Sequence, residues 1–212
     1  MNTHLSNPPG VRDRKKAEKR LAISNIATRM FVERGFENVS VDDIAREADV
    51  ARKTVFNYFP RKEDLVFDRE EDVRALMRQA LAERGQQSPL LALQTLMRTL
   101  VEEQHPIFRI TERAIQFWRM VEESPALTAR ARELQVTLAD DLAGMLCDAV
   151  GKPHSDSDAR LAAAMLMATL VVAYSEALSA FREKRKPKAA FVEVMERGFA
   201  GVNVALAETP YI

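Results

Sequence analysis

Apolar residues recur along most of this chain at the i, i+3, i+4 spacing that places them on one face of an α-helix. In the first such segment the repeating positions are Leu21, Ile23, Ile26, Ala27, Met30 and Phe31. No stretch of useful length alternates apolar and polar residues as a half-buried strand would. The pattern therefore predicts an all-α protein.

Glycine, proline and polar clusters divide this pattern into separate helices. The predicted breaks fall at residues 85–89, 105–106, 124–125, 151–156 and 184–188. Gly35 has the place of a residue that ends a helix, and Ser40 with Asp43 resembles a capping box that begins the next one. Pro60 must end the helix before it and suits the first turn of another helix, which we expect to continue to Leu81.

The predicted helix at 51–59 has an unusual outward face. A helical projection points Ala51, Val55 and Phe59 inward, with Tyr58 at the edge, and Lys53, Thr54, Phe56 and Asn57 outward, with Arg52 at the border. An outward phenylalanine gains little unless another surface covers it, and the DNA major groove offers thymine methyl groups and base edges. With the short helix at 41–48 this matches a helix-turn-helix. A helical hairpin whose neighbour covers Phe56 fits the same spacing.

Charge and composition narrow the class of protein. The net charge of the 212 residues is zero. Residues 1–64, however, include thirteen basic and ten acidic residues, which allows a local basic surface. Cys147 is the single cysteine, so no internal disulfide forms, as in a reducing compartment. The apolar run 161–174 is shorter than the roughly 20 residues of a membrane span. We therefore expect a soluble, cytoplasmic protein that does not enter a membrane.

Residues at fixed spacing between 22 and 66 form a recognisable motif. They are Phe31, Gly35, Phe36, Ser40, Val41, Ile44, Ala45, the run 48–51, the run 54–56, Tyr58, Phe59 and the run 62–65. This segment resembles the DNA-binding domain of TetR-family transcriptional repressors. It departs from the family pattern at three positions: Asp49 replaces the glycine of the turn, Ala51 a serine that would cap the helix, and Phe56 the common tyrosine.

The resemblance implies a domain organisation and a DNA-binding surface. Its domains would be a disordered arm at 1–11, a three-helix helix-turn-helix domain at 12–60, and a helical effector-binding and dimerisation domain at 61–212. Lys53, Thr54 and Asn57 would meet bases or nearby phosphates, and Ser40, Arg52, Tyr58 and Lys62 would meet the DNA backbone. The helical projection adds the outward Phe56 to this DNA-binding surface. Arg12, Arg14, Lys15 and Lys16 would form a flexible basic arm that contacts phosphates or the minor groove, or else a solubilising tail.

The resemblance further implies a homodimer, because two recognition helices must enter successive major grooves roughly 34 Å apart on a near-palindromic operator. Helices at about 157–183 and 189–207 are expected to form its seam as a four-helix bundle. The second has the apolar stripe Phe191, Val194, Met195, Phe199, Val202 and Leu206. These residues would equally complete the core of a monomer.

The middle helices would then hold a pocket for a small apolar or amphipathic effector that releases a repressor from DNA. An acyl-CoA-like effector is among those that the resemblance suggests. Candidate lining residues, chosen as large and adaptable side chains, are Met97, Phe108, Phe117, Trp118, Met120, Met145, Met167 and Tyr174. Any of them fits equally as plain core. An anionic group on the effector could be bound by His105, Arg109, Arg113 or Arg119, unless these side chains are solvated or paired on helix faces.

Residues typical of catalytic and metal sites are sparse. The three histidines are scattered, and a single Glu-x-x-His at 102–105 falls short of the two copies, with two further glutamates, that a di-iron bundle needs. No phosphate loop or nucleophile motif is present. We expect no enzymatic activity, metal or cofactor. A di-iron-type enzyme and an effector-free architectural DNA-binding protein are the alternatives, and the large methionine-rich body argues against the second.

Overall fold

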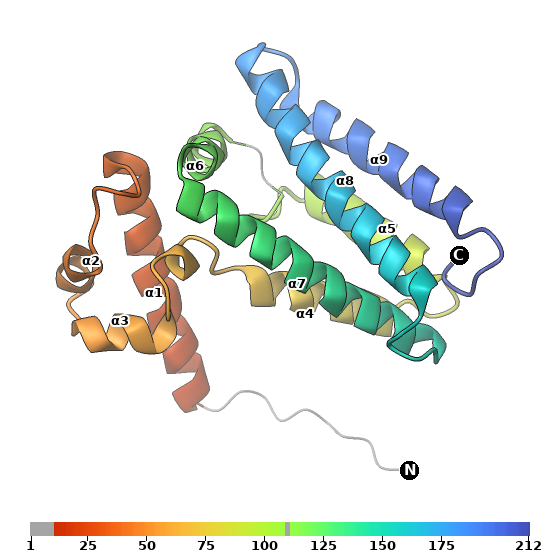
Figure 1. The fold of residues 1–212 in the computed structure, drawn as a ribbon, viewed down its shortest axis with the longest axis horizontal. Coiled ribbons are helices and arrows are strands. Elements are labelled where there is room, and N and C mark those ends of the chain that lie inside the picture. Colours follow the sequence, from red (N-terminus) through yellow and green to blue (C-terminus); the bar gives the residue numbers. More distant parts are fainter. Residues whose placement is uncertain (1–10, 109–110) are drawn as a thin grey trace. The chain divides into compact units, whose positions relative to one another are not determined.

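The computed structural model describes residues 11–108 and 111–212, and these residues form helices and connecting turns with no strand (Figure 1). The elements in order are α1 (Val11–Arg34), α2 (Val41–Glu47), α3 (Arg52–Tyr58), the short 3₁₀ helix η1 (Glu63–Leu65), α4 (Glu70–Ala82), α5 (Pro89–Glu102), α6 (Glu112–Glu123), α7 (Pro125–Val150), α8 (Ser157–Arg182) and α9 (Pro187–Ala205). The all-α prediction is confirmed, and each predicted break includes residues that connect two helices, although three of them extend into the first turn of the next helix.

The chain forms two compact units. The first contains the described residues up to Asp68 together with Met120–Leu127, and the second contains Arg69–Arg119 and Thr128–Ile212. Both α6 and α7 therefore contribute residues to each unit. In the first unit the Ser124 hydroxyl, just before α7, donates a hydrogen bond of 3.0 Å to the Glu37 carboxylate.

The first unit is a helix-turn-helix head built on α1. Most of the apolar face of α1 is buried, with Ala27 and Phe31 fully enclosed, and Ile44 of α2 and Val55 of α3 complete this small core. Leu21, which was predicted on the same face, is 42% exposed. Gly35 has a φ of +83°, and its N–H donates to the Phe31 carbonyl, so the expected glycine end of the helix is confirmed. Burial of these apolar faces fixes where α2 and α3 lie on α1.

Two expectations for the first unit are wrong. Residues 60–62 bend and η1 follows, so no continuous helix runs from Pro60 to Leu81. Leu65 is fully buried in the first unit, which draws the chain inward before α4 begins. The positions Arg14 to Lys16 lie within α1 and do not form a flexible arm, and Arg14 approaches Glu18 to 3.7 Å. Of the arm predicted at 1–11, residues 1–10 lie outside the described residues and Val11 begins α1.

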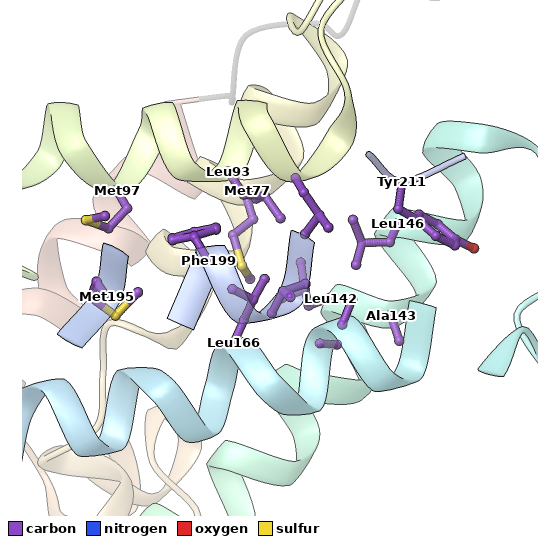
Figure 2. Close-up of a cluster of buried hydrophobic side chains, with 14 of the residues drawn as sticks. Met77, Leu93, Met97, Leu142, Ala143, Leu146, Leu166, Met195, Phe199 and Tyr211 are labelled. Carbon is purple, nitrogen blue, oxygen red and sulfur yellow. The ribbon is translucent and has the colours of Figure 1, made fainter. Parts of the chain in front are cut away.

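The second unit is a helical body in which α8 packs along α9, and α5 contacts both α4 and α9. Ion pairs join its helices at the surface: Arg98 of α5 binds Glu196 of α9 through two hydrogen bonds of 2.6 and 2.7 Å. Arg74 of α4 binds Asp141 of α7 at 2.6 Å. The helices enclose a core of aliphatic, methionine and aromatic side chains (Figure 2).

Helix α8 is long and apolar enough to cross a membrane when judged by length and composition alone. The sequence-based expectation considered only the shorter run 161–174. One third of the window that meets this test is buried inside the unit, and core helices of soluble proteins meet it too. The packing of α8 along α9 accounts for the buried part of this apolar surface.

Candidate DNA-binding surface and effector cavity

Helix α3 presents the mixed face that its sequence predicts. Val55 and the following Phe59 are buried at 1% exposure, whereas Lys53 and Asn57 are exposed and Phe56 is 38% exposed. The alternative in which a neighbouring helix covers Phe56 is therefore wrong within this chain. Ala51 differs from the projection, because it is the exposed N-cap residue and its side chain makes no capping bond.

Local hydrogen bonds define both the start of α2 and the turn between α2 and α3. Ser40 and Asp43 form the predicted capping box at the start of α2, with 3.1 Å between the Asp43 amide and the Ser40 hydroxyl oxygen. The Ser40 hydroxyl in turn donates a hydrogen bond of 2.6 Å to the Asp43 carboxylate, and this bond, followed by one from the Ser40 amide, lowers the pKa of the Asp43 carboxyl below its usual value. Asp49 adopts a φ of +49°, a conformation that aspartate tolerates better than most residues. The turn thus forms without the glycine that is usual in the family.

Arg52 connects the two helices of the motif at the surface. Its guanidinium group donates a hydrogen bond of 2.9 Å to the Asp42 carboxylate of α2. The same group lies over the exposed Phe56 ring, 5.5 Å from its centroid. Both members of the ion pair are well exposed, so the pair contributes little stability. Arg52 therefore remains at the surface beside the outward face of α3, where an incoming phosphate could compete with Asp42.

The Lys62 side chain, which was predicted to contact the DNA backbone, makes its contacts within the first unit. Its ammonium group donates a hydrogen bond of 2.6 Å to the Phe36 carbonyl oxygen and lies 4.1 Å from the centroid of the Phe36 ring. It is also within 5.6 Å of the Phe31 ring centroid. Burial lowers the pKa of this amine. Through these contacts the Lys62 side chain links the segment after α3 to the residues that end α1. Tyr58, in contrast, is only half-buried.

A cavity of about 80 Å³ lies inside the second unit. Side chains from α4, α5, α7, α8 and α9 and from the α5–α6 connection form its wall: Val73, Leu76, Met77, Leu93, Leu96, Met97, Leu100, Ile107, Phe108, Leu142, Leu166, Met167, Leu170, Met195 and Phe199. Figure 2 shows several of these, including Met77, Met97, Leu166 and Phe199, pointing toward a shared interior. This cavity is the candidate effector site.

Three of the eight predicted ligand residues line the cavity: Met97, Phe108 and Met167. Tyr174 and Trp118 lie beside it in an aromatic cluster, and Phe117 contacts Trp118 with 5.4 Å between ring centroids. Met145 is partly buried against the core, and Met120 belongs to the first unit. Of the predicted anion-binding side chains, Arg109 lies outside the described residues.

Sequence reasoning missed the contributions of α4 and α9 to the cavity. Met195 and Phe199 were expected at a dimer seam because they form an apolar stripe, but both are buried within the subunit, as are Phe191, Val202 and Leu206. That assignment of the stripe is therefore wrong. The helical spacing of Val73 and Met77 was the available signal for α4, and it does not specify which neighbour the helix covers.

The described part of α8 leaves a different apolar face exposed. Leu161, Val171 and Val172 have 46%, 51% and 56% of their surface exposed, and Ala164 and Ala168 lie between them at helical spacing. On α9 the exposed Ala200, Gly201 and Val204 continue this small-residue surface. We name these eight residues the α8–α9 face.

No group of three or more His, Cys, Asp or Glu side chains that could hold a metal occurs among the described residues.

Comparison with known proteins supports the same assignment of the head. The sequence profile of the family "Bacterial regulatory proteins, tetR family" matches residues 23–68. A curated Mycobacterium tuberculosis protein, assigned as the mycofactocin biosynthesis transcriptional regulator MftR, is 52% identical over 40 residues. That aligned segment covers 19% of this chain and 20% of the relative, so the likeness is confined to a fifth of the relative's length.

Solved structures match over most of the chain. The SmeT–triclosan complex superimposes with a TM-score of 0.54 at 21% identity, covering 87% of this chain and 91% of SmeT. SmeT is a repressor of a multidrug efflux pump in Stenotrophomonas maltophilia. Thermus thermophilus FadR, in complex with lauroyl-CoA, superimposes with a TM-score of 0.52 at 24% identity, covering 86% and 92%. At these identities the likeness establishes the fold.

The profile match covers the whole helix-turn-helix, and the shared fold extends through the helical body. Family members are DNA-binding transcription factors and not enzymes, in agreement with the absence of a catalytic motif from the sequence. The described head and body together have the architecture of that fold, an N-terminal helix-turn-helix domain followed by a C-terminal helical domain. The helix-turn-helix segment at residues 23–68 therefore matches the tetR family of bacterial regulatory proteins, and the chain shares its fold with SmeT and FadR.

Proposed function

We propose that this protein is a dimeric, cytoplasmic transcriptional repressor that binds a near-palindromic DNA operator and releases it when a small apolar molecule binds the helical body. The observation that carries the proposal is the outward face of α3, where an exposed phenylalanine stands between a lysine and an asparagine. Such a face is poorly suited to water and well suited to a major groove. We place the boundary between the DNA-binding and effector domains between Pro60 and the start of α4.

The proposed roles of the surface residues follow from their exposure. Lys53 and Asn57 reach base edges or adjacent phosphates, Phe56 contacts thymine methyl groups, and Thr54 lies at the edge of the same surface. Arg52 exchanges the Asp42 carboxylate for a DNA phosphate. Ser40 and Tyr58 flank this surface as backbone contacts.

The proposed dimer uses the α8–α9 face. An exposed apolar surface on two adjacent helices favours a protein–protein contact. A second copy of the chain would supply the same two helices and complete a four-helix bundle. One head makes too few contacts for specific binding at cellular salt, so the dimer is needed for operator recognition.

The proposed effector site is the apolar cavity of the second unit. The fold is shared with SmeT, which was crystallised with triclosan, and with FadR, which was crystallised with lauroyl-CoA. An effector can release DNA only if it binds the DNA-free form of the dimer more tightly than the DNA-bound form.

Selection of bound sequences from a random DNA pool tests the proposal. The expected result is an enriched sequence with two half-sites related by a dyad and separated by about one helical turn. Binding of that duplex should weaken steeply as salt rises. Failure to enrich any sequence, with purified protein that is folded by circular dichroism, would contradict the DNA-binding function.

A further inference from the structure

The wall of the cavity restricts the chemistry of what it can hold. Each of its described side chains is aliphatic, aromatic or a thioether, and they come from five helices and the α5–α6 connection. No described side chain on the wall carries a formal charge, a hydroxyl group or an amide. A ligand in this cavity would therefore find almost no hydrogen-bonding partner among these side chains.

A charged group would enter such a wall at a large cost. It would lose its water shell and gain no counter-charge from the described side chains of the wall, which disfavours binding by several orders of magnitude. Cavities lined by leucine and phenylalanine stay dry and take neutral guests such as benzene. The same physics favours an uncharged guest here.

The size of the cavity indicates a small guest, and its methionines allow some expansion. A volume of about 80 Å³ is roughly half that of the engineered cavity of about 150 Å³ that binds benzene. Met77, Met97, Met167 and Met195 all line the wall. Methionine side chains are unbranched and flexible, so they can move aside for a guest somewhat larger than the cavity.

We propose that the ligand of this cavity is a small uncharged apolar molecule of hydrocarbon or aryl type, and that carboxylates, phosphates and nucleotide head groups are excluded from it. This inference rests on the proposed function only in taking the cavity as the effector site. An acyl-CoA-like effector could place only its hydrocarbon chain in this cavity, because no described side chain on the wall could pair with its charged head.

An internal fluorophore lies next to the cavity. The Phe108 ring lines the wall and stacks on the Tyr174 ring, with 6.3 Å between centroids and 8° between planes. Tyr174 in turn lies 5.1 Å from Trp118, the single tryptophan of the chain. The Tyr174 hydroxyl donates a hydrogen bond of 2.5 Å to the Ile107 carbonyl oxygen, which holds this cluster together. A guest that displaces Phe108 should change the emission of Trp118.

The experiment titrates the full-length, DNA-free protein with toluene and with benzoate, which differ mainly in replacing a methyl group by a carboxylate. Trp118 emission and the thermal unfolding midpoint are both measured. The expected result is that toluene changes the emission and raises the midpoint, and that benzoate binds at least about 100-fold more weakly.

Matched variants locate the binding. Leu96→Phe fills the cavity from α5, and Leu91→Phe makes the same change on the same helix at a position that is 45% exposed. Leu96→Phe should weaken toluene binding at least tenfold and Leu91→Phe should leave it unchanged. Leu170→Phe fills the cavity from α8 and takes the place of Leu96→Phe if that variant does not fold.

Three results would each overturn the inference. Benzoate could bind as tightly as toluene, toluene could fail to bind up to its solubility, or toluene could bind Leu96→Phe and Leu170→Phe as tightly as it binds the unmodified protein. These measurements contain no DNA. Failure of the DNA selection therefore contradicts the repressor function alone, and failure of toluene binding contradicts the ligand class alone.

Discussion

The Lys62 ammonium group donates a hydrogen bond to the Phe36 carbonyl oxygen and lies against the Phe36 ring, so it joins the segment after α3 to the residues that end α1. A lysine at this position was expected to contact the DNA backbone. The ammonium instead binds within the head, where a charge-assisted hydrogen bond and a cation–π contact reinforce each other. These contacts predict that Lys62 stabilises the helix-turn-helix more than it binds phosphate.

Replacement of Lys62 by methionine tests this role. Lys62→Met keeps most of the aliphatic stem and removes the hydrogen bond, so the free energy of unfolding should fall by about 1–2 kcal/mol. Lys53→Met is the control, because Lys53 is exposed on α3 and its loss should not change stability. Chemical denaturation of both variants and the unmodified protein provides the comparison.

DNA binding by the same two variants separates the alternatives. Lys53→Met should reduce the salt dependence of binding by about one ion, and Lys62→Met should leave it unchanged at temperatures where the protein is folded. If Lys62→Met has unchanged stability and a reduced salt dependence of DNA binding, Lys62 contacts the DNA backbone as the sequence predicted.

Asn57 is predicted to determine sequence preference. Asn57→Ala removes an exposed amide that can pair with a base edge, so the ratio of operator binding to nonspecific binding should fall roughly tenfold or more. Gln86→Ala removes an exposed amide from the second unit and should have no effect. Titrations of the selected operator and of a scrambled duplex give the ratio, and an unchanged ratio in Asn57→Ala would show that another residue reads the bases.

The contact between α8 and α9 predicts unequal effects of two glycine substitutions. A β-carbon at Gly198 would lie 2.1 Å from Thr169 Cγ2 and 2.8 Å from Thr169 Cβ, which no side-chain rotation relieves. Gly198→Ala should therefore destabilise the protein by about 2 kcal/mol or more. At Gly201 the nearest atom to a β-carbon is Met165 Cε at 4.0 Å, so Gly201→Ala should be tolerated within the subunit.

Denaturation of the two variants at one protein concentration measures this difference. Because both changes replace glycine by alanine in α9, they share the same gain in helix propensity of about 1 kcal/mol. Equal stability of Gly198→Ala and Gly201→Ala would mean that α8 and α9 are farther apart than the structure indicates.

Val172 is predicted to lie at the dimer contact. It is 56% exposed on the α8–α9 face, and Val172→Asp would place a carboxylate in an apolar seam. The variant should sediment as a monomer at micromolar concentration where the unmodified protein is a dimer. Val136→Asp on α7, at a position that is 63% exposed, should remain dimeric. If Val136→Asp is monomeric and Val172→Asp is dimeric, the dimer contact lies on α7 and not on the α8–α9 face.

The fold class and much of the recognition motif follow from residues close together in sequence. Helical spacing, Gly35 at a helix end and the Ser40–Asp43 capping box are each confirmed, because they depend on bonds between residues within about four positions of each other. The outward position of Phe56 follows from the same periodicity. The family resemblance then names the motif, as the profile match over residues 23–68 confirms.

Only the tertiary structure decided which helix faces meet. An apolar stripe states that one face of α9 is covered, but not whether the cover is the same subunit or another, so Met195 and Phe199 could not be assigned to the cavity from sequence. In the same way, the sequence predicts that Lys62 contacts a phosphate, and only the fold shows that its ammonium group also lies 2.6 Å from the Phe36 carbonyl oxygen. Local bonds fix each helix, whereas these choices depend on packing between residues far apart in the chain, which no local pattern records.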